Sequence, residues 1–232
     1  MTTTIATLNI RHGGRKSTDA LASRMLGYDA DVLVVTEFRA NEVGSRFRTR
    51  LEGAGYTTSH PDVDSKLNTV LIASRRGIDR SWPFSDQLDA NHLWCAQIAD
   101  MTVCAVYMPQ RTAKLPYWEA LIAHARREGI ELLVGDFNTG NNDLDKDPKG
   151  AKFIGPEMPS RLAASGYTDI WRSLHPHTRE YSWYSRPGNN GFRLDYMFAS
   201  LEVANRVTSC EFDHVPRQAG ETDHSGLIAL LG

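Results

Sequence analysis

Polar residues that could move a proton or hold a metal ion stand at the ends of apolar runs. Asp136 and Asn138 follow the run Leu132 to Val134, and two residues apart on an extended segment they point the same way. Such a pair can hold a water molecule for attack, with Asp136 accepting its proton and Asn138 fixing its position. The alternative is an Asx turn that only ends the strand.

Three further residues suit a metal ion. Glu37 and Asp223 each stand at one end of an apolar run, where a carboxylate can project into a cleft. Asn9, at the end of another such run, could orient a ligand, a water molecule or a phosphate oxygen. Taken singly, Asn9 could instead cap a turn and Glu37 could be a solvated loop residue. Mg²⁺ and Mn²⁺ both bind oxygen ligands, so the sequence does not separate them.

His224 is the histidine that has a candidate partner. Asp195 could orient its ring and keep it cationic against a phosphate, although Asp223 and His224 could also be a plain surface pair. A cationic imidazole would stabilise the negative charge of a transition state. The remaining histidines, including His60, His92, His124, His175 and His177, are expected to be structural or surface residues.

Composition is that of an ordinary soluble globular protein. The chain has 232 residues, 41% of them hydrophobic and 23% charged, and its formal net charge is −2. Proteins that grip duplex DNA along a track usually carry a basic excess, so any contact with nucleic acid must come from local patches. The composition neither supports nor excludes a DNA substrate.

The sequence predicts a monomeric cytoplasmic protein that does not enter a membrane. Met1 to Ile5 lacks the pattern of a signal peptide, and no apolar run reaches the roughly 20 residues of a membrane helix. Cys95, Cys104 and Cys210 are too far apart for a zinc site and odd in number, which favours buried free thiols.

Apolar periodicity predicts an α/β protein in a single domain, residues 1–232. The expected strands are 4–10, 31–36, 67–74, a hairpin of 93–99 and 102–107 turning at 100–101, 131–135, short strands near 181 and 193–199, 203–212 and 225–231. The expected helices are 17–27, 41–53, 112–127 and 156–165, and residues 141–155 form a long loop.

The ordered set of polar motifs resembles the endonuclease/exonuclease/phosphatase superfamily, most closely its exonuclease III-like branch. The resemblance covers nearly the whole chain, and it combines pieces that are weak singly. These pieces are Asn9, Glu37, Tyr107-Met108-Pro109-Gln110, Gly135-Asp136-Phe137-Asn138, Asp169 to Pro176, Tyr181-Ser182-Trp183-Tyr184-Ser185, Gly191-Phe192-Arg193-Leu194-Asp195-Tyr196 and Asp223-His224-Ser225.

This resemblance implies a four-layer α/β sandwich, in which two packed, mainly antiparallel sheets are flanked by helices. It also implies Mg²⁺- or Mn²⁺-dependent phosphodiester hydrolysis with DNA as partner. Glu37 and Asp223 would hold the metal with Asn9 close by, and Tyr107, Asp136, Asn138, Asp195 and His224 would form the catalytic set. The expected substrate-binding residues are Asn68, Trp183, Phe192 and Arg193, of which Trp183 could instead be a core residue.

The chain departs from the family pattern near the first asparagine, around Glu37 and in the strand at 68–74. These departures leave the chemistry intact and affect the substrate. The first hypothesis is a DNA-repair nuclease with apurinic/apyrimidinic (AP) endonuclease and 3′-to-5′ exonuclease or 3′-phosphodiesterase activity. The second is an enzyme of the same fold that acts on single-stranded DNA, RNA or a small phosphodiester. A binding module without activity is a third, which the presence of the whole catalytic set disfavours.

Overall fold

Two six-stranded sheets form the centre of the protein in a computed structural model that describes residues 2–232. Sheet 1 has the order β13-β14-β1-β2-β4-β3, and its strands are β1 (Thr3–Asn9), β2 (Val32–Phe38), β3 (Thr57–Ser59), β4 (Thr69–Ser74), β13 (Val207–Asp213) and β14 (Gly226–Leu231). Sheet 2 has the order β5-β6-β7-β8-β12-β9, and its strands are β5 (Arg80–Pro83), β6 (Leu93–Ile98), β7 (Met101–Tyr107), β8 (Leu132–Asp136), β9 (Tyr167–Asp169) and β12 (Asp195–Ser200).

Each sheet contains one parallel pair, β1–β2 and β7–β8, and all other neighbours are antiparallel. The prediction of two mainly antiparallel sheets is therefore confirmed. Parallel neighbours end at the same edge of a sheet, so the last residues of β1 and β2 lie together, as do those of β7 and β8. Both pairs end at the edge that carries the candidate residues.

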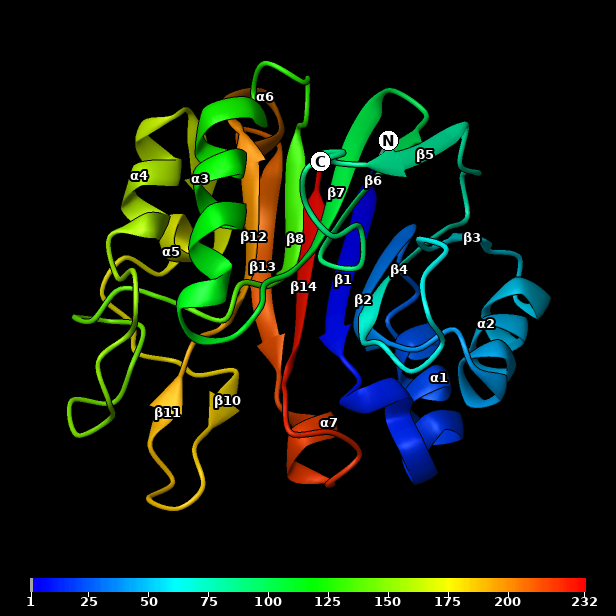
Figure 1. The fold of residues 1–232 in the computed structure, drawn as a ribbon, viewed down its shortest axis with the longest axis horizontal. Helices are drawn as coiled ribbons and strands as arrows, with labels where there is room; N and C mark the ends of the chain where they lie inside the picture. Colours follow the sequence, from blue (N-terminus) through cyan, green and yellow to red (C-terminus); the bar gives the residue numbers. More distant parts are fainter. Residues whose placement is uncertain (1) are drawn as a thin grey trace.

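Helices cover the outer face of each sheet (Figure 1). Sheet 1 packs against α1 (Thr18–Gly27) and α2 (Glu42–Gly53), and sheet 2 packs against α3 (Leu115–His124) and α4 (Met158–Ala164). Shorter elements complete the fold: the 3-10 turns η1 (His12–Ser17) and η2 (Arg111–Lys114), the helices α5 (Ile170–Leu174), α6 (Leu201–Ala204) and α7 (Val215–Gln218), and a hairpin of β10 (Trp183–Tyr184) and β11 (Gly191–Phe192).

Three layers of apolar side chains separate the sheets and helices. Val34 of β2 and Val134 of β8 meet in the core between the sheets, whereas Leu33 faces the helices of sheet 1 and Leu133 those of sheet 2. Successive side chains of a strand point to opposite faces. Because both faces are covered, both positions must be apolar, which explains the continuous apolar runs in the sequence.

Several predicted boundaries are corrected. Residues 203–204 belong to α6, which Ser200 begins by accepting a hydrogen bond from the Val203 amide, so the strand predicted from 203 starts at Val207. The β6–β7 turn is Ala99-Asp100, because Ile98 pairs with Met101. The helix predicted over 112–127 is shorter, since η2 precedes it and it ends at His124.

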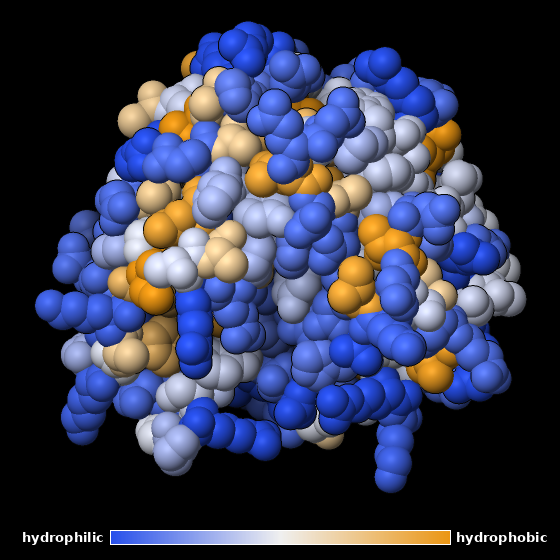
Figure 2. Space-filling view, in the orientation of Figure 1, coloured by the Kyte–Doolittle hydropathy of each residue, from blue (hydrophilic) through white to orange (hydrophobic). Residues whose placement is uncertain are grey.

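The surface seen in Figure 2 is mainly hydrophilic, with apolar residues scattered over it. No helix within residues 2–232 is both long enough and apolar enough to cross a membrane. The three cysteines are buried free thiols, as predicted.

Candidate active site

Tyr107, Asp136 and Asp195 stand in one row across three neighbouring strands of sheet 2. Asp136, the last residue of β8, is in register with Tyr107 at the end of β7 and with Asp195 at the start of β12. Their positions continue the alternation that directs Val134 and Met197 into the core between the sheets. The three side chains therefore project toward sheet 1 at the edge of that core.

Asn9 joins the two sheets at this edge. It ends β1 on the face that carries Ile5 toward sheet 2, and its amide Nδ2 donates to Asp136 Oδ2 at 2.9 Å and to Glu37 Oε1 at 3.2 Å. Thr222 Oγ1 donates to the Asn9 carbonyl at 2.7 Å, which fixes the segment leading to Asp223. Asn9 is fully buried, and its Oδ1 accepts a hydrogen bond from the Arg11 amide at 2.9 Å, so it caps the turn after β1 as well as facing the two carboxylates.

A β-bulge directs Glu37 into the site. Thr36 pairs with Val70 and Phe38 pairs with Thr69, which leaves Glu37 without a partner on β4 and with φ at 56°. A bulge shifts the alternation by one residue. Phe38 accordingly packs against the outer helices, and the Glu37 carboxylate accepts hydrogen bonds from Asn9 and from the His12 amide, the latter at 2.9 Å.

Asn68 supports Glu37 and Tyr107. Its Nδ2 donates to Glu37 Oε2 at 2.9 Å and to the Tyr107 hydroxyl at 3.3 Å, and its Oδ1 accepts from Arg39 Nε at 2.7 Å. Asn68 was predicted to bind substrate, but it does not line the cleft described below. The amide orients two neighbouring side chains, Glu37 and Tyr107, and its substrate-binding role stays a prediction.

Asp136 and Asn138 form an Asx turn and also face the site. The Asn138 amide donates to Asp136 Oδ1 at 2.9 Å, and the Asn138 side chain donates to the Met108 carbonyl at 2.7 Å. Asn138 has φ at 48°, and buried Lys114 donates to its carbonyl from η2. The Asx turn is therefore present, and it leaves Asp136 Oδ2 facing Asn9; the role of the pair in holding a water molecule stays a prediction.

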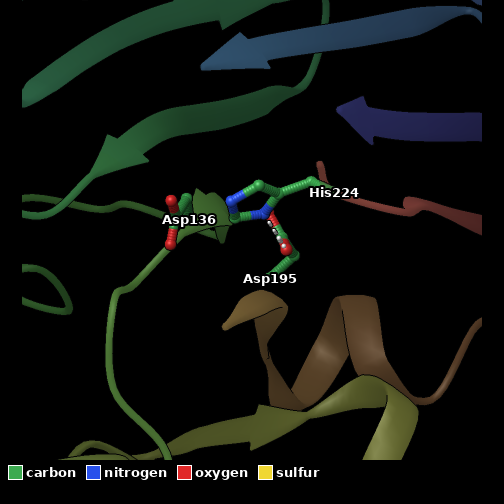
Figure 3. Close-up of side chains that lie close together, drawn as sticks. All are labelled: Asp136, Asp195 and His224. Atoms are coloured by element: carbon green, nitrogen blue, oxygen red, sulfur yellow. Dashed lines mark hydrogen bonds and ion pairs between the residues drawn. The ribbon is translucent and has the colours of Figure 1, made fainter. Parts of the chain in front are cut away.

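His224 and Asp195 form a buried pair beside Asp136 (Figure 3). Nδ1 of His224 lies 2.8 Å from Asp195 Oδ2, and the other ring nitrogen faces Asp136. The three side chains offer ligand atoms within 4.8 Å of one another. They come from β8, from the start of β12 and from the loop before β14.

Burial and charge shift the pKa values of this group. Burial, followed by repulsion from Asp195, raises the pKa of Asp136 to about 7. Burial disfavours the cationic form of His224, but Asp195 and Asp136 outweigh it and raise the pKa of His224 to about 10. At neutral pH the imidazole is therefore cationic, and Asp136 populates both its protonated and its ionised form.

A cleft of about 410 Å³ opens onto these residues. Its lining comes from both sheets, the hairpin and the long loop, and consists of Arg11, His12, Glu37, Tyr107, Gln110, Arg111, Asp136, Asn138, Phe153, Trp183, Phe192, Leu194, Asp223 and His224. Phe153 and Arg111 were not predicted. The sequence signals that could have indicated a role in the cleft are that Phe153 lies in the long loop and that Arg111 directly follows the Tyr107 motif.

The residues fit an oxygen-seeking cation. Glu37, Asp136 and Asp223 bring carboxylates to one cleft, and buried Asp195 Oδ1 has no hydrogen-bond partner among residues 2–232. Mg²⁺ prefers such oxygen ligands in octahedral geometry and keeps several water molecules. Asp223 is partly exposed and lies 3.4 Å from Arg11 Nε, so its carboxylate can face the cleft.

Trp183 and Phe192 reach the cleft as predicted for substrate-binding residues. They are directly opposite each other on β10 and β11, with ring centroids 5.9 Å apart. Phe153 packs against the edge of Phe192 with a centroid distance of 5.4 Å. Together they form an apolar wall beside the charged residues.

Arg193 lies outside the cleft, which corrects its predicted role. Its side chain is 1% exposed, with Nε 2.8 Å from Asp145 Oδ1 and Nη2 2.7 Å from Asp169 Oδ2. The guanidinium also stacks on Tyr196 at 4.1 Å. Arg193 is thus a buried structural residue that ties the long loop and β9 to the start of β12.

Comparison with known proteins identifies the architecture. Residues 6–224 match the endonuclease/exonuclease/phosphatase family. An exodeoxyribonuclease of Streptococcus pneumoniae serotype 4 is 28% identical over an alignment of 145 residues, and the match covers 49% of this chain and 53% of that protein. The alignment thus spans about half the length of the curated relative.

Solved structures share the fold over nearly the whole chain. An AP endonuclease from Archaeoglobus fulgidus superposes with a TM-score of 0.85 at 23% identity, covering 99% of both chains. A 3′ phosphatase from Neisseria bound to a product DNA hairpin gives 0.85 at 21% identity, also covering 99% of both. Since the family match covers residues 6–224 and with them every catalytic candidate, the chain belongs to the endonuclease/exonuclease/phosphatase family.

Proposed function

We propose that this protein is a divalent-metal-dependent hydrolase of DNA phosphodiester bonds. The proposed activities are AP endonuclease and 3′-to-5′ exonuclease or 3′-phosphodiesterase, as used in DNA repair. The observation that carries the proposal is the buried Asp136 carboxyl beside the Asp195–His224 pair, at the floor of a cleft with further carboxylates. The named activities of the relatives support DNA as the substrate.

Asp136 would take the proton of the attacking water. A general base works best when its pKa lies near the working pH, and burial with Asp195 repulsion raises the pKa of Asp136 to about 7. Asn138 is held through its amide to Asp136 and its side chain to Met108, so it can orient the water or the phosphate.

His224 and Tyr107 would act on the phosphate oxygens. The cationic imidazole presents its free ring nitrogen toward the Asp136 side of the cleft, where negative charge develops in the transition state (Figure 3). Burial, with the nearby Glu37 carboxylate, raises the pKa of Tyr107, which keeps its hydroxyl protonated and able to donate a hydrogen bond.

Glu37 and Asp223 would hold Mg²⁺ or Mn²⁺, with Asn9 close to them. When bound, the ion supplies Lewis-acid stabilisation of phosphoryl oxygens. Three hydrogen bonds of 2.9 to 3.2 Å fix the Glu37 carboxylate. They come from the side-chain amides of Asn9 and Asn68 and from the backbone amide of His12. Such outer contacts orient a ligand before the metal arrives.

Trp183 and Phe192 would receive a nucleotide or an abasic sugar. Their rings form an apolar wall next to the catalytic carboxyl and imidazole groups. Stacking on an aromatic face is worth about 1–3 kcal/mol per base.

We further propose one catalytic domain that works as a cytoplasmic monomer, which the shared core of both sheets and the three free thiols support.

A second candidate keeps the fold and metal site but acts on single-stranded nucleic acid, RNA or a small phosphodiester. The net charge of −2 and the modest cleft of about 410 Å³ favour it over a protein that follows long duplexes. Steep loss of affinity with salt would indicate a polynucleotide substrate, whereas a small substrate would show little salt dependence.

The test uses a fluorescent duplex with one abasic-site analogue, an intact duplex and a single strand, each incubated with Mg²⁺, Mn²⁺ or EDTA. Metal-dependent incision at the abasic site, lost in Asp136→Ala, supports the proposal. Degradation of the single strand or of intact ends alone would favour the second candidate. Hydrolysis of a simple phosphodiester without cleavage of any DNA would overturn the DNA assignment while retaining the catalytic centre.

A further inference from the structure

A second cavity adjoins the catalytic cleft. It measures about 440 Å³ and lies between the β10–β11 hairpin and α7. Its lining residues are Arg11, Trp183, Tyr184, Ser185, Arg186, Asn189, Arg217, Gly220, Thr222 and Asp223. Arg11, Trp183 and Asp223 also line the catalytic cleft, so the two cavities share a wall. A ligand in one cavity would therefore lie next to a ligand in the other.

The second cavity is basic in a chain of negative net charge. Three arginines line it against a single carboxylate, Asp223, whereas the whole chain carries −2. The nearby acids are engaged elsewhere: Glu221 by Arg24 at 2.7 Å and Glu180 by His214 at 2.8 Å. Among residues 2–232, neither Arg186 nor Arg217 forms an ion pair.

Arg217 is held in place without being neutralised. Its guanidinium carbon lies 4.4 Å from the centre of the Tyr184 ring, and its Nε lies 3.1 Å from Ser225 Oγ. Both contacts leave the two terminal nitrogens without a hydrogen-bond partner within the described residues. A planar guanidinium fixed in this way is suited to a phosphate, which it can bind through two parallel hydrogen bonds.

Aromatic rings accompany these charges. Trp183 stands at the boundary of the two cavities and Tyr184 follows it on the same strand, inside the second. Both rings line the second cavity and Trp183 also lines the catalytic cleft, so each cavity has an aromatic surface. Positive charge next to aromatic rings is the combination that binds single strands of nucleic acid, by phosphate contact and base stacking.

We propose that the second cavity binds the nucleotide that neighbours the scissile phosphate. Its phosphate would lie between Arg11, Arg186 and Arg217, with its base against Tyr184 or Trp183. This inference rests on the proposed function and specifies its substrate as a strand that extends past the cleft. The hairpin and α7, which form the cavity, lie together at the end of the molecule where β1 points (Figure 1), and this end is hydrophilic in Figure 2.

The test compares two substrates: a labelled oligonucleotide of about 12 nucleotides, long enough to fill such a site, and bis(p-nitrophenyl) phosphate, which ends at the cleft. The variants are Arg186→Ala and Arg217→Ala, with Arg217→Lys as a charge-conserving variant. Arg80→Ala is the matched control, because exposed Arg80 stacks on Trp82 at 4.6 Å on the distant strand β5.

We expect kcat/KM for the oligonucleotide, relative to the small substrate, to fall about tenfold in each alanine variant, as for one charge-assisted contact. The dependence of log kcat/KM on log salt should become shallower by about 0.7 per arginine removed. Arg217→Lys should restore the salt dependence, and Arg80→Ala should change neither measurement. Arg186 is exposed in the hairpin turn, so its removal tests the cavity even if Arg217→Ala lowers the melting temperature.

Equal losses on both substrates, or no loss on either while wild type cleaves the oligonucleotide, would overturn this inference and leave the proposed function standing. A wild-type protein that hydrolyses bis(p-nitrophenyl) phosphate but no oligonucleotide would overturn both. The two failures are therefore distinguishable.

Discussion

Asp136 and Asp195 lie directly opposite each other on the antiparallel strands β8 and β12, and both side chains are buried. Two ionised carboxylates at this distance repel each other, and His224 relieves the repulsion by bonding to Asp195. The two neighbouring carboxylates therefore have different electrostatic environments. Asp195 is paired with the imidazole ring, while the pKa of Asp136 is raised by burial and by Asp195.

Asp195→Asn should move the alkaline limit of activity to lower pH. After burial, which opposes it, Asp195 is the largest influence on His224 and raises its pKa, so the neutral amide must lower that pKa from about 10. We expect kcat to fall about 10²–10⁴-fold, within the range for lost acid–base or electrostatic assistance. The measurement is the pH profile of kcat/KM with Mg²⁺ present.

The control for this prediction is Asp19→Asn, which removes an exposed carboxylate on α1. Its profile should match that of wild type. An Asp195→Asn enzyme that is slower but has an unmoved alkaline limit would mean that His224 does not act as a cation.

The metal-free protein should lose stability as pH rises from about 4 to about 7. Because the pKa of Asp136 is raised in the folded state to about 7, from about 4 in the unfolded chain, folding becomes costlier as this carboxyl ionises between those values. His224 adds a second loss between about 6.5 and its folded pKa of about 10, since its cationic form favours the folded state. The measurement is urea unfolding in EDTA across this pH range.

Asp136→Asn separates the two effects. The variant should be less stable at every pH, because its amide nitrogen faces the donors Asn9 or Asn138. It should nevertheless lose the slope between about pH 4 and 6 and keep the slope above about pH 7. An unchanged acidic slope would assign the effect to another group.

Asn68→Ala should weaken metal binding without removing a ligand. The Asn68 amide fixes Glu37 Oε2 at 2.9 Å, and loss of such support typically costs about 10–100-fold in metal affinity. Glu37→Gln, which removes the charge itself, should cost more. Mn²⁺ titration followed by electron paramagnetic resonance measures both directly, independently of activity. Equal affinity in Asn68→Ala and wild type would exclude the supporting role.

Much of the fold could be predicted because the sheets are covered on both faces. That burial makes runs such as Leu132 to Val134 apolar throughout, and polar residues at their ends then mark the functional edge. The meeting of Asn9 with Asp136, 127 residues apart, follows once both strands are assigned to facing sheets.

Side-chain direction could not be predicted where local geometry breaks the alternation. The bulge at Glu37 depends on the register with β4, which no residue type near Glu37 encodes. The partners of Arg193, Asp145 and Asp169, are 48 and 24 residues away in the sequence. Its place beside Leu194 and Asp195 therefore suggested a cleft residue, although its guanidinium forms buried ion pairs with Asp145 and Asp169.

Arg193→Ala should destabilise the protein and spare its chemistry. Removing the guanidinium leaves Asp145 and Asp169 without their buried partner, and such a loss typically costs about 3–5 kcal/mol. We expect urea unfolding to report a loss of this size, and kcat per folded molecule to stay near the wild-type value at low temperature. Arg46→Ala, which breaks an exposed pair with Glu42 on α2, should change stability by no more than about 0.5 kcal/mol. An Arg193→Ala protein of wild-type stability with a raised KM for DNA would instead restore Arg193 to the substrate-binding residues.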